Sequence, residues 1–206
     1  MTWVKITTTP KSLLALDTEV ANRWWWYDGK STNRLMMFVG QWVETREGYP
    51  QLPAFGWVIL PDIIMQSHAM RKHYRGLPVV TRAEALRRIS LTVEDADTLV
   101  GHNLTGFDIG TINGELKLLN MPLLPEREVI DTLKSAHKVI GQSMSLANRL
   151  SRLPDTVEKP HVDPVVWEAA FNEFDPDALH EVWLRATTDV QGHIDLFIND
   201  LERSYV

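Results

Sequence analysis

The sequence predicts an α/β protein. Three observations lead to this class: residues 1–60 contain three short apolar runs of strand length, residues 61–150 alternate apolar runs with segments of helical periodicity, and residues 176–205 carry one long apolar stripe of helical spacing. Such alternation is typical of a sheet covered by helices. The chain has 206 residues, 44% of them hydrophobic, so we expect one domain spanning residues 1–206.

The first three predicted strands cover residues 12–20, 35–43 and 55–60. Turn signals between them, such as Asp28-Gly29, favour antiparallel pairing of neighbours. The run Trp24-Trp25-Trp26 comes directly after the first strand. These rings either stack on nucleic-acid bases or pack at an edge of the core, and the sequence leaves both interpretations open.

The middle of the chain alternates between predicted helices and strands. Helices are expected at 61–75, 81–91, 108–120 and 143–150, and strands at 99–103 and 128–133. The first of these helices is expected to turn Ile63, Ile64 and Met70 inward. Thr81 and Glu84 form a capping box at the start of the second helix. Residues 154–177 are expected to be irregular, because four prolines interrupt them: Pro154, Pro160, Pro164 and Pro176.

The last predicted helix spans residues 176–205. Its apolar stripe has i, i+3, i+4 and i+7 spacing: Leu179, Val182, Trp183, Ala186, Val190, Ile194, Phe197 and Leu201. Asp189 falls on the flank of that stripe. An acid at the border of a buried face is usually paired or coordinated. Arg185, one turn earlier, offers a pairing within the helix, and a metal ion offers the alternative.

Composition excludes several classes of protein. The chain has no cysteine, so disulfides, thiolate catalysis and cysteine-based zinc sites are excluded. No run approaches the roughly 20 apolar residues of a membrane span, and the N-terminus lacks the pattern of a signal peptide. We therefore expect a soluble cytoplasmic protein without a membrane partner. The net charge of −6 argues against a protein that coats duplex DNA, although cations would offset a carboxylate-lined metal site.

Four acidic residues stand at the ends of predicted elements that can converge. Asp17 and Glu19 share one face of the first strand because side chains alternate with period two. Asp108 opens a helix directly after a strand and a turn, and Asp189 lies on the last helix. Each acid alone has an explanation without function, such as a solvated strand end or a helix dipole. Together they predict two divalent cations roughly 3.5–4 Å apart and in-line hydrolysis of a phosphate ester.

Several segments match, in order and spacing, the motifs of one known family. They are LALDTE (14–19), VGHN through FD (100–108), VIDTL with SMSL (129–146) and Asp189-Val190. The chain thereby resembles the DEDD 3′→5′ exonucleases, and most closely the proofreading domains of family B DNA polymerases. The resemblance covers about residues 12–200.

This resemblance implies a ribonuclease-H-like fold, with a mixed central sheet flanked by helices. It implies Mg²⁺ or Mn²⁺, two ions, held by the catalytic residues Asp17, Glu19, Asp108 and Asp189. It also implies stepwise release of 5′-nucleotides from a 3′ end. By the same resemblance, the terminal nucleotide would lie near four further residues: Thr18, His102, Asn103 and Phe107.

The chain departs from the family at the group that positions the attacking water. The family has a Tyr four residues before the last Asp or a His five residues before it, and here these positions hold Arg185 and Leu184. Arg stays protonated and cannot act as a base, although Arg185 could hold a phosphate oxygen. The general base is then His193, one turn later, or a residue of the 154–177 segment such as His161, or the metals act alone.

The leading hypothesis from the sequence is a metal-dependent exonuclease acting on the 3′ ends of single-stranded DNA, with RNA as an alternative substrate. Any proofreading would occur in trans, with a DNA polymerase or another replication or repair protein as partner. The second hypothesis is a catalytically impaired relative that binds nucleic acid or a protein. A two-carboxylate glycosidase would use Asp17 and Glu19 but leaves Asp108 and Asp189 without roles.

Overall fold

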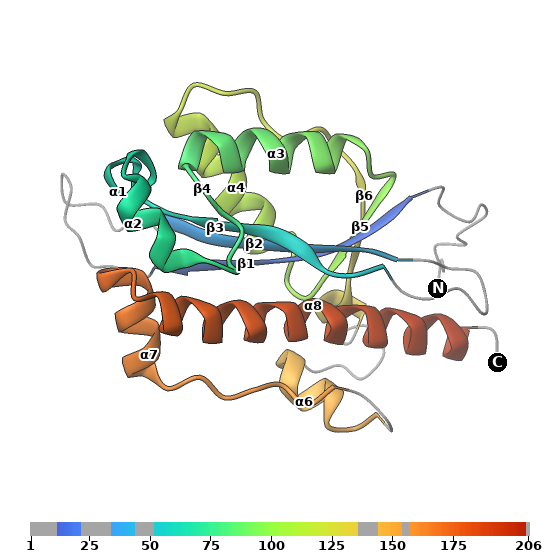
Figure 1. The fold of residues 1–206 in the computed structure, drawn as a ribbon. Coiled ribbons are helices and arrows are strands. Elements are labelled where there is room, and N and C mark those ends of the chain that lie inside the picture. Colours follow the sequence, from blue (N-terminus) through green and yellow to red (C-terminus); the bar gives the residue numbers. More distant parts are fainter. Residues whose placement is uncertain (1–11, 22–33, 44–51, 136–143, 154–156, 205–206) are drawn as a thin grey trace, which may run out of the picture.

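A six-stranded sheet lies between helices on both of its faces (Figure 1). This architecture comes from a computed structural model, which describes residues 12–21, 34–43, 52–135, 144–153 and 157–204. The Trp24-Trp25-Trp26 run, for which the sequence left two interpretations, lies outside these described residues. The predicted α/β class, with a mixed sheet flanked by helices, is confirmed.

The sheet has the order β4-β3-β2-β1-β5-β6. Its strands are β1 (Leu13–Ala21), β2 (Arg34–Val43), β3 (Phe55–Ile59), β4 (Val79–Val80), β5 (Thr98–Gly101) and β6 (Glu128–Asp131). The antiparallel pairing predicted for the first three strands is confirmed, whereas β1–β5, β5–β6 and β3–β4 are parallel pairs. The two-residue strand β4 was not predicted, because it is too short to show a period.

The helices form two layers around this sheet (Figure 1). They are α1 (Asp62–Gln66), α2 (His68–Arg71), η1 (Lys72–Tyr74), α3 (Arg82–Glu94), α4 (Asp108–Leu118), α6 (Leu146–Leu150), α7 (Pro164–Glu168), the π-helical turn η2 (Ala169–Glu173) and α8 (Pro176–Ser204). Helices α3 and α4 cover one face, and α8 crosses the other with α6 and α7 beside it. Among the described helices, none has the length and apolar character needed to cross a membrane.

Strand β1 lies in the middle of the fold and divides the core into two layers. Leu13 and Ala15 pack in the cluster that includes α8, whereas Leu14 and Leu16 pack in the cluster that includes α3 and α4. This alternation is the expected consequence of the period of a strand. The same alternation over the next three residues points Asp17 and Glu19 toward α8 and Thr18 toward α4.

The helix predicted over residues 61–75 is interrupted, which corrects the sequence expectation. Ser67 has extended backbone angles (φ −87°, ψ 113°), and its hydroxyl accepts a hydrogen bond from the backbone N–H of Met70. A new short helix therefore begins after Ser67. As a result Ile64 is buried, but Ile63 is 73% exposed and Met70 is also exposed.

The segment predicted to be irregular, 154–177, contains helical structure after its first part. Asp163 caps α7 by accepting a hydrogen bond from the backbone N–H of Val165, and Pro164 occupies the first turn, where its missing N–H costs nothing. The π-helical turn η2 follows and packs Ala170 and Phe171 against α8. Proline therefore starts this helix instead of breaking one.

Candidate metal centre

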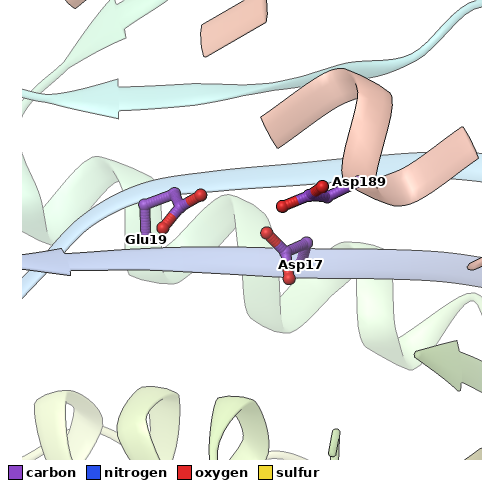
Figure 2. A group of neighbouring side chains, drawn as sticks. All are labelled: Asp17, Glu19 and Asp189. Carbon is purple, nitrogen blue, oxygen red and sulfur yellow. The ribbon is translucent and has the colours of Figure 1, made fainter. Parts of the chain in front are cut away.

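Three carboxylates from distant parts of the chain meet between β1 and α8. Asp17 and Glu19 project from β1, and Asp189 projects from α8 toward them (Figure 2). One carboxylate oxygen from each residue lies within 4.8 Å of those from the other two. The predicted sharing of one strand face by Asp17 and Glu19 is what brings both to this point.

Asp189 reaches the cluster because α8 packs its apolar stripe on the sheet. Val182, Ala186 and Val190 of that stripe are fully buried, and Asp189 itself is only 3% exposed. Its Oδ1 atom is buried and has no hydrogen-bond partner among the described residues. Because an unpaired buried carboxylate oxygen is costly, this atom fits a position beside a cation.

Asp108, the first residue of α4, lies beside β1 at Thr18. Its Oδ1 accepts hydrogen bonds from the backbone N–H of Thr18 at 2.9 Å and from the Thr18 hydroxyl at 2.6 Å. The pairing of β1 with β5 covers only Leu13 to Ala15, so the Asp108 side chain provides a partner for the backbone beyond that pairing. Asp108 is therefore a neighbour of the three-carboxylate group and is not one of its members.

The electrostatics of the site oppose full ionisation. Burial raises the pKa of Asp17 well above its ordinary value, and the charges of Asp108, Glu19 and Asp189 raise it further. Burial also raises the pKa of Glu19 to about 7, partly offset by Arg185. For Asp108, burial raises the pKa to about 7 against the hydrogen bonds from Thr18. Added positive charge would favour ionisation of all these carboxyl groups.

Two cationic side chains contact two of the three acids, Glu19 and Asp189. Lys159 Nζ lies 2.7 Å from Asp189 Oδ2, within hydrogen-bond distance. Arg185 spans two acids, with Nη1 3.6 Å from Glu19 Oε1 and Nη2 3.7 Å from Asp189 Oδ2. The pairing of Arg185 with Asp189 within α8, one of the two alternatives from the sequence, is thus present in the structure.

A pocket of about 530 Å³ opens beside the carboxylates. Its lining comes from β1, the start of α4 and the α7–η2 segment: Thr18, Glu19, Val20, Ala21, Phe107, Trp167, Glu168, Phe171 and Asn172. Thr18 and Phe107, two of the residues expected near a terminal nucleotide, are part of this lining. Aromatic rings on two sides of a pocket next to acids suit a flat, phosphorylated ligand.

His102 and Asn103 lie on the loop between β5 and α4, which is held by residues at the end of β6. Asp131 accepts hydrogen bonds from the backbone N–H groups of Asn103 and Thr105 and from the Thr105 hydroxyl. His102 Nδ1 lies 3.0 Å from the hydroxyl of Thr132. Asn103 adopts a left-handed backbone conformation (φ 67°), which asparagine tolerates better than most residues. Neither His102 nor Asn103 is among the described residues that line the pocket.

His193 is enclosed between α8 and β1. Its Nδ1 donates a hydrogen bond to the backbone oxygen of Leu16 at 3.1 Å, and the residue is 1% exposed. Burial lowers the pKa of His193 to about 3, so its ring stays neutral. These surroundings favour a structural role over the general-base role considered from the sequence. His161, the other histidine considered, is exposed.

Three residues that matter at the site were not identified from the sequence. Lys159 and Trp167 belong to the proline-interrupted segment, which has no periodicity from which to predict where its side chains point. Asp131 was predicted only as part of the VIDTL segment, without a role of its own. The only sequence feature that pointed to Lys159 is that a lysine precedes the helix that carries Asp189, since a lysine there can pair with that acid.

The donor set suits hard divalent cations. Carboxylate oxygens are the ligands preferred by Mg²⁺ and Mn²⁺, and the cluster offers three such groups with the buried Oδ1 of Asp189 among them. Lys159 and Arg185 compensate part of the same negative charge. The residues therefore fit a metal centre at which protein cations and metal ions share the carboxylates.

Comparison with known proteins supports the fold alone. No model of a protein family matches the sequence, and no curated protein matches it. Among solved structures, the chain is similar to the family B DNA polymerase from the hyperthermophilic archaeon Pyrobaculum calidifontis, with a TM-score of 0.60 and 16% identity. The match covers 92% of this chain and 24% of that polymerase, so the chain spans about a quarter of its length.

Proposed function

We propose that this chain is a 3′→5′ exonuclease of the DEDD superfamily, with a ribonuclease-H-like fold and a single domain over residues 1–206. Its proposed metal ligands and catalytic residues are Asp17, Glu19, Asp108 and Asp189. The proposed cofactors are two Mg²⁺ or Mn²⁺ ions, and the proposed substrate is the 3′ end of single-stranded DNA.

The observation that carries this proposal is the convergence of Asp17, Glu19 and Asp189 within 4.8 Å. Burial and mutual repulsion both oppose ionisation of these three carboxylates, and burial is the larger cause of the raised pKa values of Asp17 and Glu19. Bound metal ions would offset this cost of ionisation. If the three carboxylates had only a structural role, part of the cost would remain. The similarity in fold to a family B DNA polymerase supports a nucleic-acid substrate.

Divalent cations bound here would lower the pKa of an attacking water and stabilise the departing oxygen of a phosphodiester. The chain's own groups supply the positioning. The rings of Phe107 and Trp167 at the pocket would stack on the terminal base. Thr18 lines the same pocket, and Arg185 would pair with a phosphate oxygen. We also propose that His102 and Asn103, on the loop between β5 and α4, contact the substrate.

A second candidate function is that of a nuclease-like protein that binds nucleic acid, or a protein partner, without cleaving it. The contacts of Lys159 and Arg185 favour this alternative, because both cations already lie against carboxylate oxygens of the proposed metal ligands.

If the protein is an active exonuclease, we propose a DNA polymerase or another replication or repair protein as its partner in trans.

The experiment is the degradation of a 5′-labelled single-stranded oligonucleotide with Mg²⁺ or Mn²⁺. The native protein should produce a ladder that shortens one nucleotide at a time, and Asp17→Asn should abolish it. Asp177→Asn is a matched control, because Asp177 is exposed in the first turn of α8, twelve residues before Asp189, and is not part of the three-carboxylate group. An oligonucleotide that is bound but stays intact would favour the second candidate. One that is neither bound nor cleaved would contradict the exonuclease and a nucleic-acid-binding role, and would leave only the binding of a protein partner.

A further inference from the structure

The guanidinium of Arg185 lies between two of the proposed metal ligands without a hydrogen bond to either. Its nitrogens are 3.6 Å from Glu19 Oε1 and 3.7 Å from Asp189 Oδ2, beyond the 2.7–3.2 Å that is typical of N–H···O bonds. Lys159 differs, because its Nζ makes a 2.7 Å hydrogen bond to Asp189. Of these two cations, Arg185 can leave the acids without breaking a hydrogen bond to them.

Trp167 holds the same guanidinium from outside the cluster. The Cζ atom of Arg185 lies 4.8 Å from the centre of the Trp167 ring, within the range of a cation–π interaction. The Arg185 side chain is 19% exposed, and both Glu19 and Trp167, which it contacts, line the pocket. The ring therefore offers the guanidinium a resting contact that does not depend on the carboxylates.

The positive charge of Arg185 stabilises the carboxylates of Glu19 and Asp189 when no metal ion is bound to them. Arg185 Nη1 lies 3.6 Å from Glu19 Oε1, so the guanidinium charge stabilises the ionised carboxylate. A divalent cation that uses oxygens of Glu19 and Asp189 would have to enter the volume facing this guanidinium, and like charges that close repel strongly inside a protein.

We propose that Arg185 is a displaceable internal counter-cation, which balances Glu19 and Asp189 in the metal-free protein and competes with a divalent cation for them. This inference rests on the metal binding of the proposed function and adds a residue that sets its affinity. Arg185 thereby raises the stability of the metal-free fold and lowers the affinity of the site for a cation that uses Glu19.

The test is Mn²⁺ binding, measured by titration calorimetry and by the loss of the free Mn²⁺ electron paramagnetic resonance signal. Arg185→Gln removes the charge and keeps a polar side chain, and we expect about tenfold tighter binding or an additional bound ion, since a unit charge near a carboxylate is worth at least that factor. Arg185→Lys retains the charge and should bind Mn²⁺ as the native protein does. Arg87→Gln, an exposed arginine of α3, is the control and should change nothing.

Thermal unfolding provides a second readout that a purely structural role would not reproduce. In EDTA, Arg185→Gln should melt below the native protein, because two carboxylates lose their counter-charge. In saturating Mn²⁺ the difference should shrink or reverse, since tighter binding to the folded state stabilises it more. A residue that only packs would lower the melting temperature equally in both conditions.

The outcomes separate this inference from the proposed function. Equal Mn²⁺ affinity in the native protein and Arg185→Gln would overturn the inference and leave the metal site intact. Equally tight binding by Arg185→Lys and Arg185→Gln would also overturn it, because shape and not charge would then control affinity. If neither the native protein nor Arg185→Gln binds Mn²⁺, the inference and the metal-dependent function fail together.

Discussion

Asp108 holds Thr18 by two hydrogen bonds, one to the backbone N–H and one to the hydroxyl. Both residues are buried, and they join the first turn of α4 to the middle of β1. Thr18 stands between Asp17 and Glu19, so this contact fixes the part of the strand that presents the two acids to α8. Asp108 therefore influences the metal centre through the backbone as well as through its charge.

Replacing Asp108 should cost stability even without metal. In Asp108→Ala, the buried N–H and hydroxyl of Thr18 lose their acceptor, and we expect the free energy of unfolding to fall by about 2–3 kcal/mol. Urea unfolding in EDTA measures this. The control is Asp62→Ala, an exposed acid in the first turn of α1. An Asp108→Ala protein as stable as the control would show that the two hydrogen bonds contribute nothing.

Asp17→Asn should act in the opposite direction. Burial and three neighbouring acids raise the pKa of Asp17, so its ionised form is disfavoured in the folded protein. A neutral amide removes that repulsion, and we expect a higher melting temperature in EDTA at pH 8 together with loss of the Mn²⁺-induced rise. Scanning calorimetry with and without Mn²⁺ provides the comparison. A lower melting temperature in EDTA would argue that Asp17 is satisfied as a carboxylate in the metal-free fold.

The stability of the metal-free protein should fall as the pH rises from 6.5 to 8. Burial raises the pKa of Glu19 and Asp108 to about 7, so the folded state retains protons that the unfolded state has already released. Stability from these groups is present below their unfolded pKa and is lost as the pH rises through 7. His193, whose pKa is lowered to about 3 from 6.5, opposes this trend while the unfolded histidine still binds a proton, which is mainly below about pH 7.

Urea midpoints in EDTA at pH 6.5 and pH 8 measure this dependence, and Glu19→Gln should flatten it. With Mn²⁺ the trend should weaken or invert, because metal binding requires the deprotonated carboxylates. A native midpoint that rises with pH in EDTA would mean that these carboxyl groups are not destabilised by burial.

Asp131 should control the loop that carries His102 and Asn103. Its two oxygens accept from the backbone N–H groups of Asn103, Thr105 and Leu133, and these three hydrogen bonds lose their acceptor if the buried carboxylate is removed. We expect Asp131→Ala to lower the free energy of unfolding by about 3 kcal/mol, and Asp131→Asn to cost less because one acceptor remains. Hydrogen exchange of the 102–106 amides would show directly whether the loop opens.

Much of the fold follows from periodicity, and the site follows only in part. The period of β1 is sufficient to place Asp17 and Glu19 on one face, and the stripe of α8 is sufficient to place Asp189 at its border. What periodicity does not supply is the position of long side chains in segments without it. Lys159 and Trp167 lie in such a segment, so their contacts with Asp189 and Arg185 were not predictable.

At two places the structure differs from the elements predicted from the sequence, and the cause in each case is a hydrogen bond that the pattern of apolar residues does not reveal. Ser67 offers its hydroxyl to a backbone N–H three residues later, which lets a new helix start inside a stretch of helical spacing. Asp163 and Pro164 together begin α7 within a segment where prolines indicate interruption. In both cases a capping side chain decided the outcome.

Three of the proposed metal ligands come from the first described strand and the last described helix, and this separation has a consequence during synthesis. A nascent chain that has not yet released α8 from the ribosome carries Asp17 and Glu19 on a strand with one bare face. The third carboxylate, the cation of Arg185 and the apolar stripe that covers that face arrive together on one helix. If the proposed centre binds divalent cations, their affinity would report completed folding, because a chain cut off before α8 would carry Asp17 and Glu19 without the third carboxylate.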